Sequence, residues 1–252
     1  MNDKLREKSK SFAAHHPIMS DAGLRQLKGE KIADVLQEIN ISKHGLSILD
    51  IGCSNGITLM VVANRLNPDI AMGIDMDIDS LPEPGEQKYF TIMDGEHLGF
   101  SNEYFDIVLC NHTYEHVPNS DKLFSEIHRV LKHNGVVYFS AMNRLWPIEP
   151  HYKIPFVHWI PKWMSYPVMR LFGNKHQYIE TPKTLPGLKK LVRNFFIQDF
   201  TVKIIKDPEK YHATDLITSP AKSSFYSRLA RLLYPLLPGY IWILRKKTTS
   251  KG

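Results

Sequence analysis

Apolar and polar positions alternate along the middle of the chain in a way that predicts strands followed by helices. Short, nearly continuous apolar runs, such as the ones that end at Ile51 and Cys110, are typical of strands buried on both faces of a parallel sheet. Helical spacing of apolar positions separates these runs. The predicted strands are 46–51, 70–75, 89–94, 105–111 and 136–141, and the predicted helices are 20–39, 57–66 and 120–132, the last one closed by Asn134-Gly135.

The pattern changes on both sides of this middle part. Residues 1–19 form a polar arm, and Ser20 is the expected N-cap of the helix that follows. Residues 143–182 hold three tryptophans and six of the 16 prolines with little periodicity. Because linkers are rarely this aromatic, we interpret this segment as an inserted lid. Beyond it we expect a helix over 184–194, a strand through Phe200, Val202 and Ile204, an apolar stripe of Leu229, Leu232, Leu233 and Leu236, and a last strand over 240–246.

These elements predict an α/β fold with a doubly wound sheet. The expected organisation has four parts, of which the last completes the same domain as the second. They are an N-terminal arm and helix (1–44), a core (45–142), an aromatic lid insertion (143–182), and C-terminal helices with the last two strands (183–252).

Composition narrows the class of protein without naming an activity. The chain has 252 residues, a formal charge of +6 and two cysteines, which excludes a disulfide-stapled secreted scaffold. Residues 1–10 are charged and show no signal peptide, so we expect a cytoplasmic protein. Residues 222–252 contain Lys and Arg but no Asp or Glu, so the positive charge belongs mainly to this tail.

Polar residues follow four successive predicted strands, at the edge where ligands bind in doubly wound folds. They are Asp50, Asp75, Asp94 and the pair Asn111-His112. Asp75 comes nineteen residues after Gly56, where an acidic side chain can accept both hydroxyls of a ribose. The preceding turn is Gly-x-x-x-Gly and lacks the pattern that packs a pyrophosphate. A nucleoside cofactor without phosphates therefore fits, and S-adenosylmethionine is the expected one.

At this point the residues resemble a known family, the class I S-adenosylmethionine-dependent methyltransferases of the type 11 kind. Five ordered motifs carry the resemblance over residues 45–142. They are Ile48-Leu49-Asp50-Ile51-Gly52-Cys53-Ser54-Asn55-Gly56, Gly73-Ile74-Asp75-Met76, Met93 to Phe100, Phe105 to Asn111 with Tyr114-Glu115-His116-Val117, and Leu131 to Val136. The resemblance implies a Rossmann-like sheet that is mostly parallel with an antiparallel last strand.

The resemblance also implies which residues hold the cofactor. The first motif would cradle the methionine part, Asp75 the ribose and Asp94 the adenine amino group. The cofactor-binding residues implied in this way are Asp50, Gly52, Cys53, Asn55, Gly56, Asp75, Met76, Asp94, Gly95 and Asn111.

Two other patterns in the chain imitate metal sites. His112 to His116 matches the His-x-x-Glu-His signature of zinc peptidases, but it follows a buried strand and meets Pro118. Residues 75–86 imitate a calcium loop, but Ser80 stands where the loop requires glycine. We therefore predict no metal site.

Methyl transfer to a hydroxyl group would be helped by a general base. The candidates are His112, His116, Glu149 and His151. The expected reaction is O-methylation of a small molecule or glycan. A lipid or lipid-linked acceptor at a membrane surface, reached through the basic C-terminal segment, is the first alternative, although we favour a core helix for that segment. A non-catalytic cofactor-binding protein and a nicotinamide dehydrogenase are further alternatives, and nucleic acid is an unlikely partner.

Overall fold

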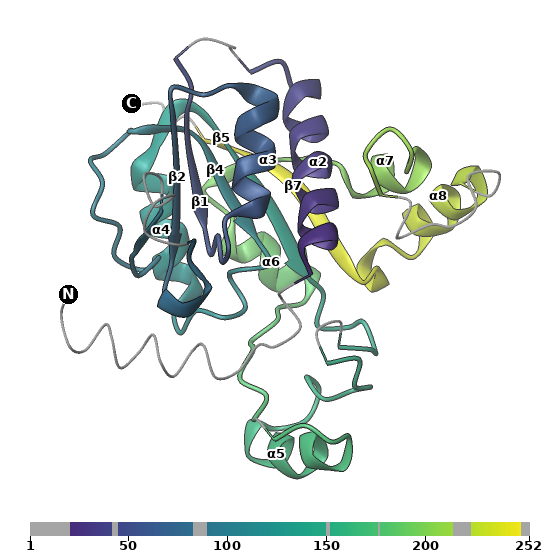
Figure 1. The fold of residues 1–252 in the computed structure, drawn as a ribbon. Coiled ribbons are helices and arrows are strands. Elements are labelled where there is room, and N and C mark those ends of the chain that lie inside the picture. Colours follow the sequence, from purple (N-terminus) through teal and green to yellow (C-terminus); the bar gives the residue numbers. More distant parts are fainter. Residues whose placement is uncertain are drawn as a thin grey trace, which may run out of the picture.

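A seven-stranded sheet forms the centre of the molecule, with helices on both faces (Figure 1). The computed structural model describes residues 21–41, 45–82, 90–149, 152–175, 177–213 and 223–247. The order of the strands is β3-β2-β1-β4-β5-β7-β6. Their bounds are β1 (Ser47–Ile51), β2 (Ile70–Asp75), β3 (Phe90–Ile92), β4 (Phe105–Asn111), β5 (Leu131–Met142), β6 (Phe195–Asp199) and β7 (Gly239–Lys246).

Strand direction agrees with the predicted topology. Strands β1 to β5 pair in parallel, whereas β7 runs antiparallel to both β5 and β6. The mostly parallel sheet with an antiparallel last strand is thus confirmed. The chain order reverses between β1 and β4, and in such sheets this switch point is where ligands bind.

Helices bury one apolar face each against the two sides of the sheet. On one side, α2 (Ala22–Glu38) and α3 (Ile57–Leu66) share a core that includes Val35 and Val62. On the other side, α4 (Ser120–Val130) and α6 (Leu185–Leu191) share a core that includes Ile127 and Leu188. Both layers enclose the sheet, as the continuous apolar strands predict.

The N-terminal helix differs from its prediction in its cap and its buried face. Asp21 is the N-cap, because its side chain accepts a hydrogen bond from the Leu24 backbone amide at 3.1 Å. Ser20 lies outside the described residues. Leu24 is 48% exposed, whereas Arg25 and Gly29 are buried against the glycine loop and α3. The first turn therefore turns a charged residue inward.

The helix predicted to run to Lys132 stops at Val130, and β5 begins at once with Leu131. Gly135 is therefore not part of a helix cap. A Cβ atom there would lie 2.9 Å from the Asp106 carbonyl oxygen, so this glycine is required by the close approach of β5 to β4.

The predicted strand through Phe200 and Ile204 is wrong, because these residues begin and fill helix α7 (Thr201–Lys206). The strand lies earlier, in β6, and Asp199 accepts a hydrogen bond from the Thr201 amide at 2.8 Å where the chain turns. Phe200 and Ile204 are four residues apart and both buried, which fits one helical face as well as alternation does.

The segment 143–182 leaves the sheet from the end of β5 and stands off it (Figure 1). It contains α5 (Lys162–Leu171), and its buried side chains form a small core of their own, made by Tyr152, Ile154, Val157, Met169 and Tyr178. Tyr114 joins the segment to the sheet, since its hydroxyl donates to the Met142 carbonyl at 3.1 Å and accepts from the Lys183 amide at 2.9 Å.

The C-terminal part contains α8 (Ser223–Leu232) and the short 3-10 helix η5 (Tyr234–Leu236) before β7. The predicted core helix is wrong for this stretch, because Leu229, Leu232, Leu233 and Leu236 are all exposed. A second 3-10 helix, η2 (Ile78–Ser80), follows β2. Among the residues that the structure describes, none of the helices combines the length and the apolarity needed to cross a membrane.

Candidate functional site

The carboxyl ends of β1, β2, β3 and β4 bring the predicted site residues to one edge of the sheet. Asp50 pairs with Gly73 of β2 and Leu109 of β4 in the register of the sheet, and Asp75 and Asn111 are the last residues of their strands. Asp94 comes two residues after the end of β3. The prediction that four strands deliver polar groups to the same edge is confirmed.

The loop between β1 and α3 requires two glycines for different reasons. Gly52 has φ +78°, and a Cβ atom there would lie 2.7 Å from Thr113 Oγ1. The Thr113 hydroxyl donates to the Ile51 carbonyl at 2.8 Å, so the segment after β4 is held against the loop. Gly56 has φ +74°, caps α3, and would collide with the Phe90 ring if it carried a Cβ. The loop is thus shaped by the segment that follows β4 and by Phe90 of β3.

Two buried acids and one buried arginine set the charge around this loop. Burial, together with the charge of Asp75, raises the pKa of Asp50 to about 7. Asp75 accepts hydrogen bonds from the backbone amides of Ser54 at 2.8 Å and Asp77 at 2.9 Å. Burial also raises the pKa of Asp75, while these hydrogen bonds act in the opposite direction.

Arg25 reaches the same loop from α2. Its Nη2 donates to Ser54 Oγ at 2.9 Å, and burial lowers the pKa of its guanidinium. Acidic side chains beside the loop disfavour a diphosphate, and they can accept hydrogen bonds from the hydroxyl groups of a ligand. The charges therefore fit S-adenosylmethionine, which has a ribose, a sulfonium and an amino group.

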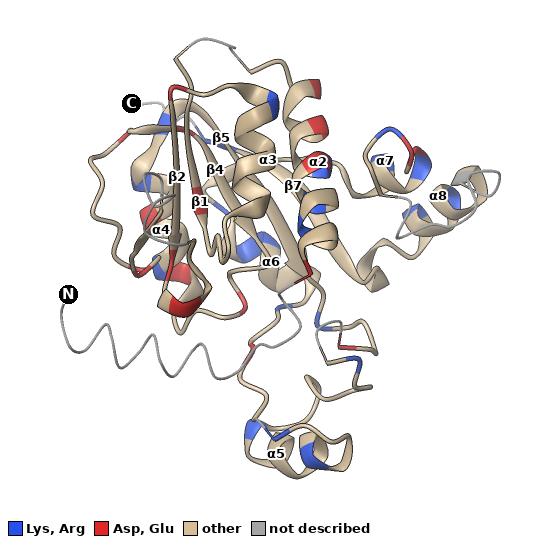
Figure 2. Cartoon of the chain, viewed as in Figure 1, with Lys and Arg blue, Asp and Glu red and all other residues tan. Residues whose placement is uncertain are grey.

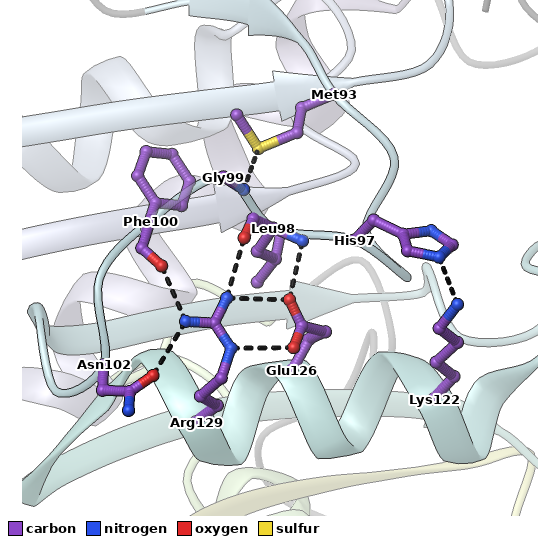
Figure 3. Close-up of polar contacts among 9 residues, drawn as sticks. All are labelled: Met93, His97, Leu98, Gly99, Phe100, Asn102, Lys122, Glu126 and Arg129. Atoms are coloured by element: carbon purple, nitrogen blue, oxygen red, sulfur yellow. Dashed lines mark hydrogen bonds and ion pairs between the residues drawn. The ribbon is translucent and has the colours of Figure 1, made fainter.

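The segment after β3 is held rigidly by α4 (Figure 3). Glu126 accepts a hydrogen bond from the Leu98 amide at 2.8 Å, and Arg129 donates to the carbonyls of Leu98 and Phe100 at 2.7 Å each. The two side chains are themselves paired at 2.8 Å. Asp94, at the start of this segment, accepts from the Glu96 amide at 3.0 Å. The loop that carries the predicted adenine-binding acid is consequently preorganised.

His112 is held on both ring nitrogens directly after β4. Nε2 lies 2.9 Å from Ser140 Oγ, and Nδ1 lies 3.3 Å from Glu115 Oε1. The Glu115 side chain is fully buried, whereas that of His112 is 30% exposed. The backbone of His112 has φ +54°, an uncommon conformation for a residue with a side chain. The ring is therefore fixed and still accessible.

The other predicted base candidates are less accessible. The His116 side chain is 6% exposed, with Nδ1 4.0 Å from Glu180 Oε1, and burial raises the pKa of Glu180 to about 7. Glu149 is fully buried and accepts a hydrogen bond from the Tyr152 amide at 2.6 Å. His151 lies outside the described residues.

The sequence did not predict a role at the site for four side chains that lie near it: Arg25, Glu115, Ser140 and Glu180. Glu115 carries a signal, because it stands three residues after His112 and so can face it across a turn. Ser140 and Arg25 carry none, since one lies inside an apolar strand and the other in a mixed helix. Only the tertiary structure brings Ser140 and Arg25 close to the site.

The remaining predicted site residues have local roles. Cys53 is buried and forms no disulfide bond, and burial raises the pKa of its thiol. Asn55 accepts from the Ile57 amide at 3.3 Å. Met76 and Asn111 are half-buried, and Gly95 lies against Leu123 and Ile51. In the described part of the chain we find no group of three or more His, Cys, Asp or Glu placed to hold a metal.

Comparison with known proteins identifies the core of the chain. Residues 49–139 match the family described as "Methyltransferase domain". The chain is 27% identical over 162 residues to the ubiquinone biosynthesis O-methyltransferase of Pasteurella multocida. The aligned region covers 56% of this chain and 64% of that protein. It is 33% identical over 112 residues to the protein of the same name from Pseudomonas putida, covering 41% and 47%. The match thus spans about half to two thirds of these relatives.

Solved structures show the same fold. The plantazolicin methyltransferase BpumL, in complex with a monoazolic desmethylPZN analog and SAH, gives a TM-score of 0.54 at 15% identity, covering 96% of this chain and 90% of that one. The [4+2]-cyclase SpnF gives 0.50 at 14% identity, covering 87% and 82%. Fold, ordered motifs and the match over 49–139 lead to one conclusion: residues 49–139 form a methyltransferase domain with the fold of the class I S-adenosylmethionine-dependent enzymes.

Proposed function

We propose that this protein transfers a methyl group from S-adenosylmethionine to a hydroxyl group of a small-molecule or glycan acceptor, with His112 as the general base. The observation that carries the proposal is the accessible His112 ring, held between Ser140 and the buried Glu115 beside the glycine loop. Relatives that are named O-methyltransferases support oxygen as the methylated atom.

The residues implied by the family motifs would hold the cofactor along the strand ends. Asp75 would take the ribose hydroxyls, Asp94 the adenine, and the loop from Gly52 to Gly56 the methionine part. Met76, Gly95 and Asn111 would complete its surroundings. When bound, S-adenosylmethionine supplies an electrophilic methyl group on its sulfonium. The segment 143–182, which leaves the sheet beside this edge, would cover the acceptor.

The contacts of His112 define its role. A carboxylate only accepts hydrogen bonds, so Glu115 selects the tautomer in which Nδ1 carries the proton and Nε2 is free to accept one. Ser140 then donates to Nε2. The acceptor hydroxyl would give its proton to Nε2 directly or through Ser140 Oγ. The resulting imidazolium would be stabilised by the buried carboxylate, which makes Glu115 a positioning residue.

Burial ranks the other candidates lower. His116 and Glu149 are buried in this structure, and Glu149 accepts a hydrogen bond from the backbone of its own turn. We therefore assign both to the joint between the segment 143–182 and the sheet. His151 stays a candidate, outside the described residues.

The proposal is tested by incubating the full chain with S-adenosylmethionine that carries a deuterated methyl group and a panel of phenols, catechols and sugars. Mass spectrometry of the products identifies the acceptor and the methylated atom. On that acceptor, His112→Gln should lower turnover by about 10²- to 10⁴-fold without changing the affinity for S-adenosylhomocysteine. The loss should shrink at high pH, where the acceptor ionises without a base.

Glu115→Gln should give a smaller loss with the same direction of pH dependence. Turnover of His112→Gln at the wild-type rate would remove His112 as the base, and methylation only of amines would remove the hydroxyl acceptor. A lipid or lipid-linked acceptor remains the first alternative. Binding of S-adenosylhomocysteine without any methyl transfer would favour the alternative of a non-catalytic cofactor-binding protein.

A further inference from the structure

Helix α8 turns its small residues inward and its large apolar residues outward. Ser227 and Ala230 are each 5% exposed, whereas Phe225 is 65% and Leu232 is 78% exposed. The following 3-10 helix continues the pattern with Leu236, which is 51% exposed. A helix that belonged to the core would show the reverse arrangement. An outward apolar face of this kind is typical of a surface that binds something.

The charged side chains that α8 itself carries are positive. Arg228 and Arg231 lie among the exposed leucines, and residues 223–247 contain no Asp or Glu. Figure 2 shows basic and no acidic residues along α8. Figure 1 shows α8 beside α7 at the rim of the molecule, away from α5. The apolar face can therefore meet a surface without obstruction from the sheet.

We propose that α8 and η5 form a peripheral docking surface for an anionic lipid bilayer. Phe225, Leu229, Leu232, Leu233 and Leu236 would enter the boundary between headgroups and acyl chains. Arg228 and Arg231 would keep their guanidinium groups among the lipid phosphates. The proposal is independent of the acceptor and of the base.

The charge of the α8 face favours a lipid bilayer over a second copy of the chain as its binding partner. A twofold contact through α8 places the same patch on both sides, so both sides of the contact carry the same two arginines. Like charges with no acidic residue on α8 to pair with them oppose such a contact. An anionic bilayer supplies both the apolar layer and the negative charge that this face lacks.

Flotation of the full chain with vesicles tests the proposal. The wild type should float with vesicles of phosphatidylcholine and phosphatidylglycerol at low salt, and less at high salt or with phosphatidylcholine alone. Leu232→Glu should weaken vesicle partitioning by at least about tenfold. Arg228→Gln and Arg231→Gln should each weaken it by about fivefold, for anionic vesicles only.

Leu171→Glu is the matched control, because Leu171 is 83% exposed on α5 and the same charge is introduced there. It should float like the wild type. Circular dichroism and S-adenosylhomocysteine binding show that each variant is folded. Absence of wild-type flotation, equal loss in the control, or a wild-type dimer that Leu232→Glu dissociates would each overturn the lipid surface.

Discussion

Burial and a neighbouring acidic residue, Asp75, both change the pKa of Asp50. Its folded pKa is about 7 against an ordinary value of 3.8, because the interior and Asp75 both disfavour its charge. The folded protein therefore binds this proton more tightly than the unfolded chain. The stability that Asp50 contributes is complete below pH 4 and is lost as the pH rises toward 7. Arg25 opposes this shift through its positive charge.

We expect Asp50→Asn, which removes this ionisation, to gain stability over the wild type as the pH rises. The difference between the two free energies of unfolding should grow by about 2 to 3 kcal/mol from pH 5 to pH 8, at about 1.4 kcal/mol per unit up to the folded pKa. Urea denaturation at both pH values measures it. Asp121→Asn, at an exposed side chain, is the control and should show no such growth. A constant difference for Asp50→Asn would contradict the raised pKa.

At the scale of elements, the start of α3 depends on a glycine that any other residue would replace only with a loss of stability. Gly56 combines a positive φ with contact against Phe90 of β3, so helix, loop and neighbouring strand meet there. Gly173, after α5, also has a positive φ of +79°, but a Cβ atom there would meet nothing within 4 Å. Substitution of Gly173 therefore introduces backbone strain alone, whereas substitution of Gly56 introduces backbone strain and steric overlap.

Gly173→Ala should therefore cost about 1 to 2 kcal/mol of stability, from the left-handed backbone alone. Gly56→Ala should cost about 2 to 5 kcal/mol, because overlap with the Phe90 ring is added to the same strain. Thermal denaturation monitored by circular dichroism gives both values. Equal losses would mean that the Phe90 ring moves aside without cost.

For the whole molecule, the two edges of the sheet hold acidic residues with different roles, in cofactor binding at one edge and in stability at the other. The proposed cofactor residues all lie at the carboxyl ends of the strands, whereas Asp106 lies near the amino end of β4. Asp106 accepts hydrogen bonds from the Ser47 amide at 2.9 Å and from Lys132 Nζ at 2.7 Å, which ties β1, β4 and β5 together. Removing an acid at the carboxyl edge should therefore weaken cofactor binding, whereas removing Asp106 at the amino edge should lower the stability.

S-adenosylhomocysteine at about 100 times its dissociation constant should stabilise the wild type by about 2.7 kcal/mol, or about 5 to 10 °C in Tm. Asp75→Asn should lose most of this shift, since it weakens the contact with the ribose. Asp106→Asn should lower the Tm of the free protein but keep the shift. Differential scanning fluorimetry measures both. A full shift in Asp75→Asn would remove Asp75 from the cofactor site.

Local signals predicted most of the core. The runs that became β2 and β4 have the predicted bounds, because their apolar stretches are continuous and end in polar residues. The same signals failed between residues 195 and 206, whereas the last strand predicted over 240–246 is present as β7 (Gly239–Lys246). The spacing of Phe200 and Ile204 suits a strand or a helix, and only the pairing of Phe195 to Asp199 with β7 decides between them. Gly135 was misread for a similar reason, since the close contact that requires it comes from another strand.

The order of the motifs along the chain was enough to indicate the fold, the cofactor and the acids at the strand ends, because parallel strands necessarily end at one edge. Tertiary contact alone decided the partners of His112, the approach of Arg25 to the glycine loop and the outward face of α8. Those features join residues far apart in the chain, such as Arg25 and Ser54, or depend on which side of a helix meets the protein. Periodicity shows that a helix has an apolar face, but only packing shows whether that face meets the protein or the outside.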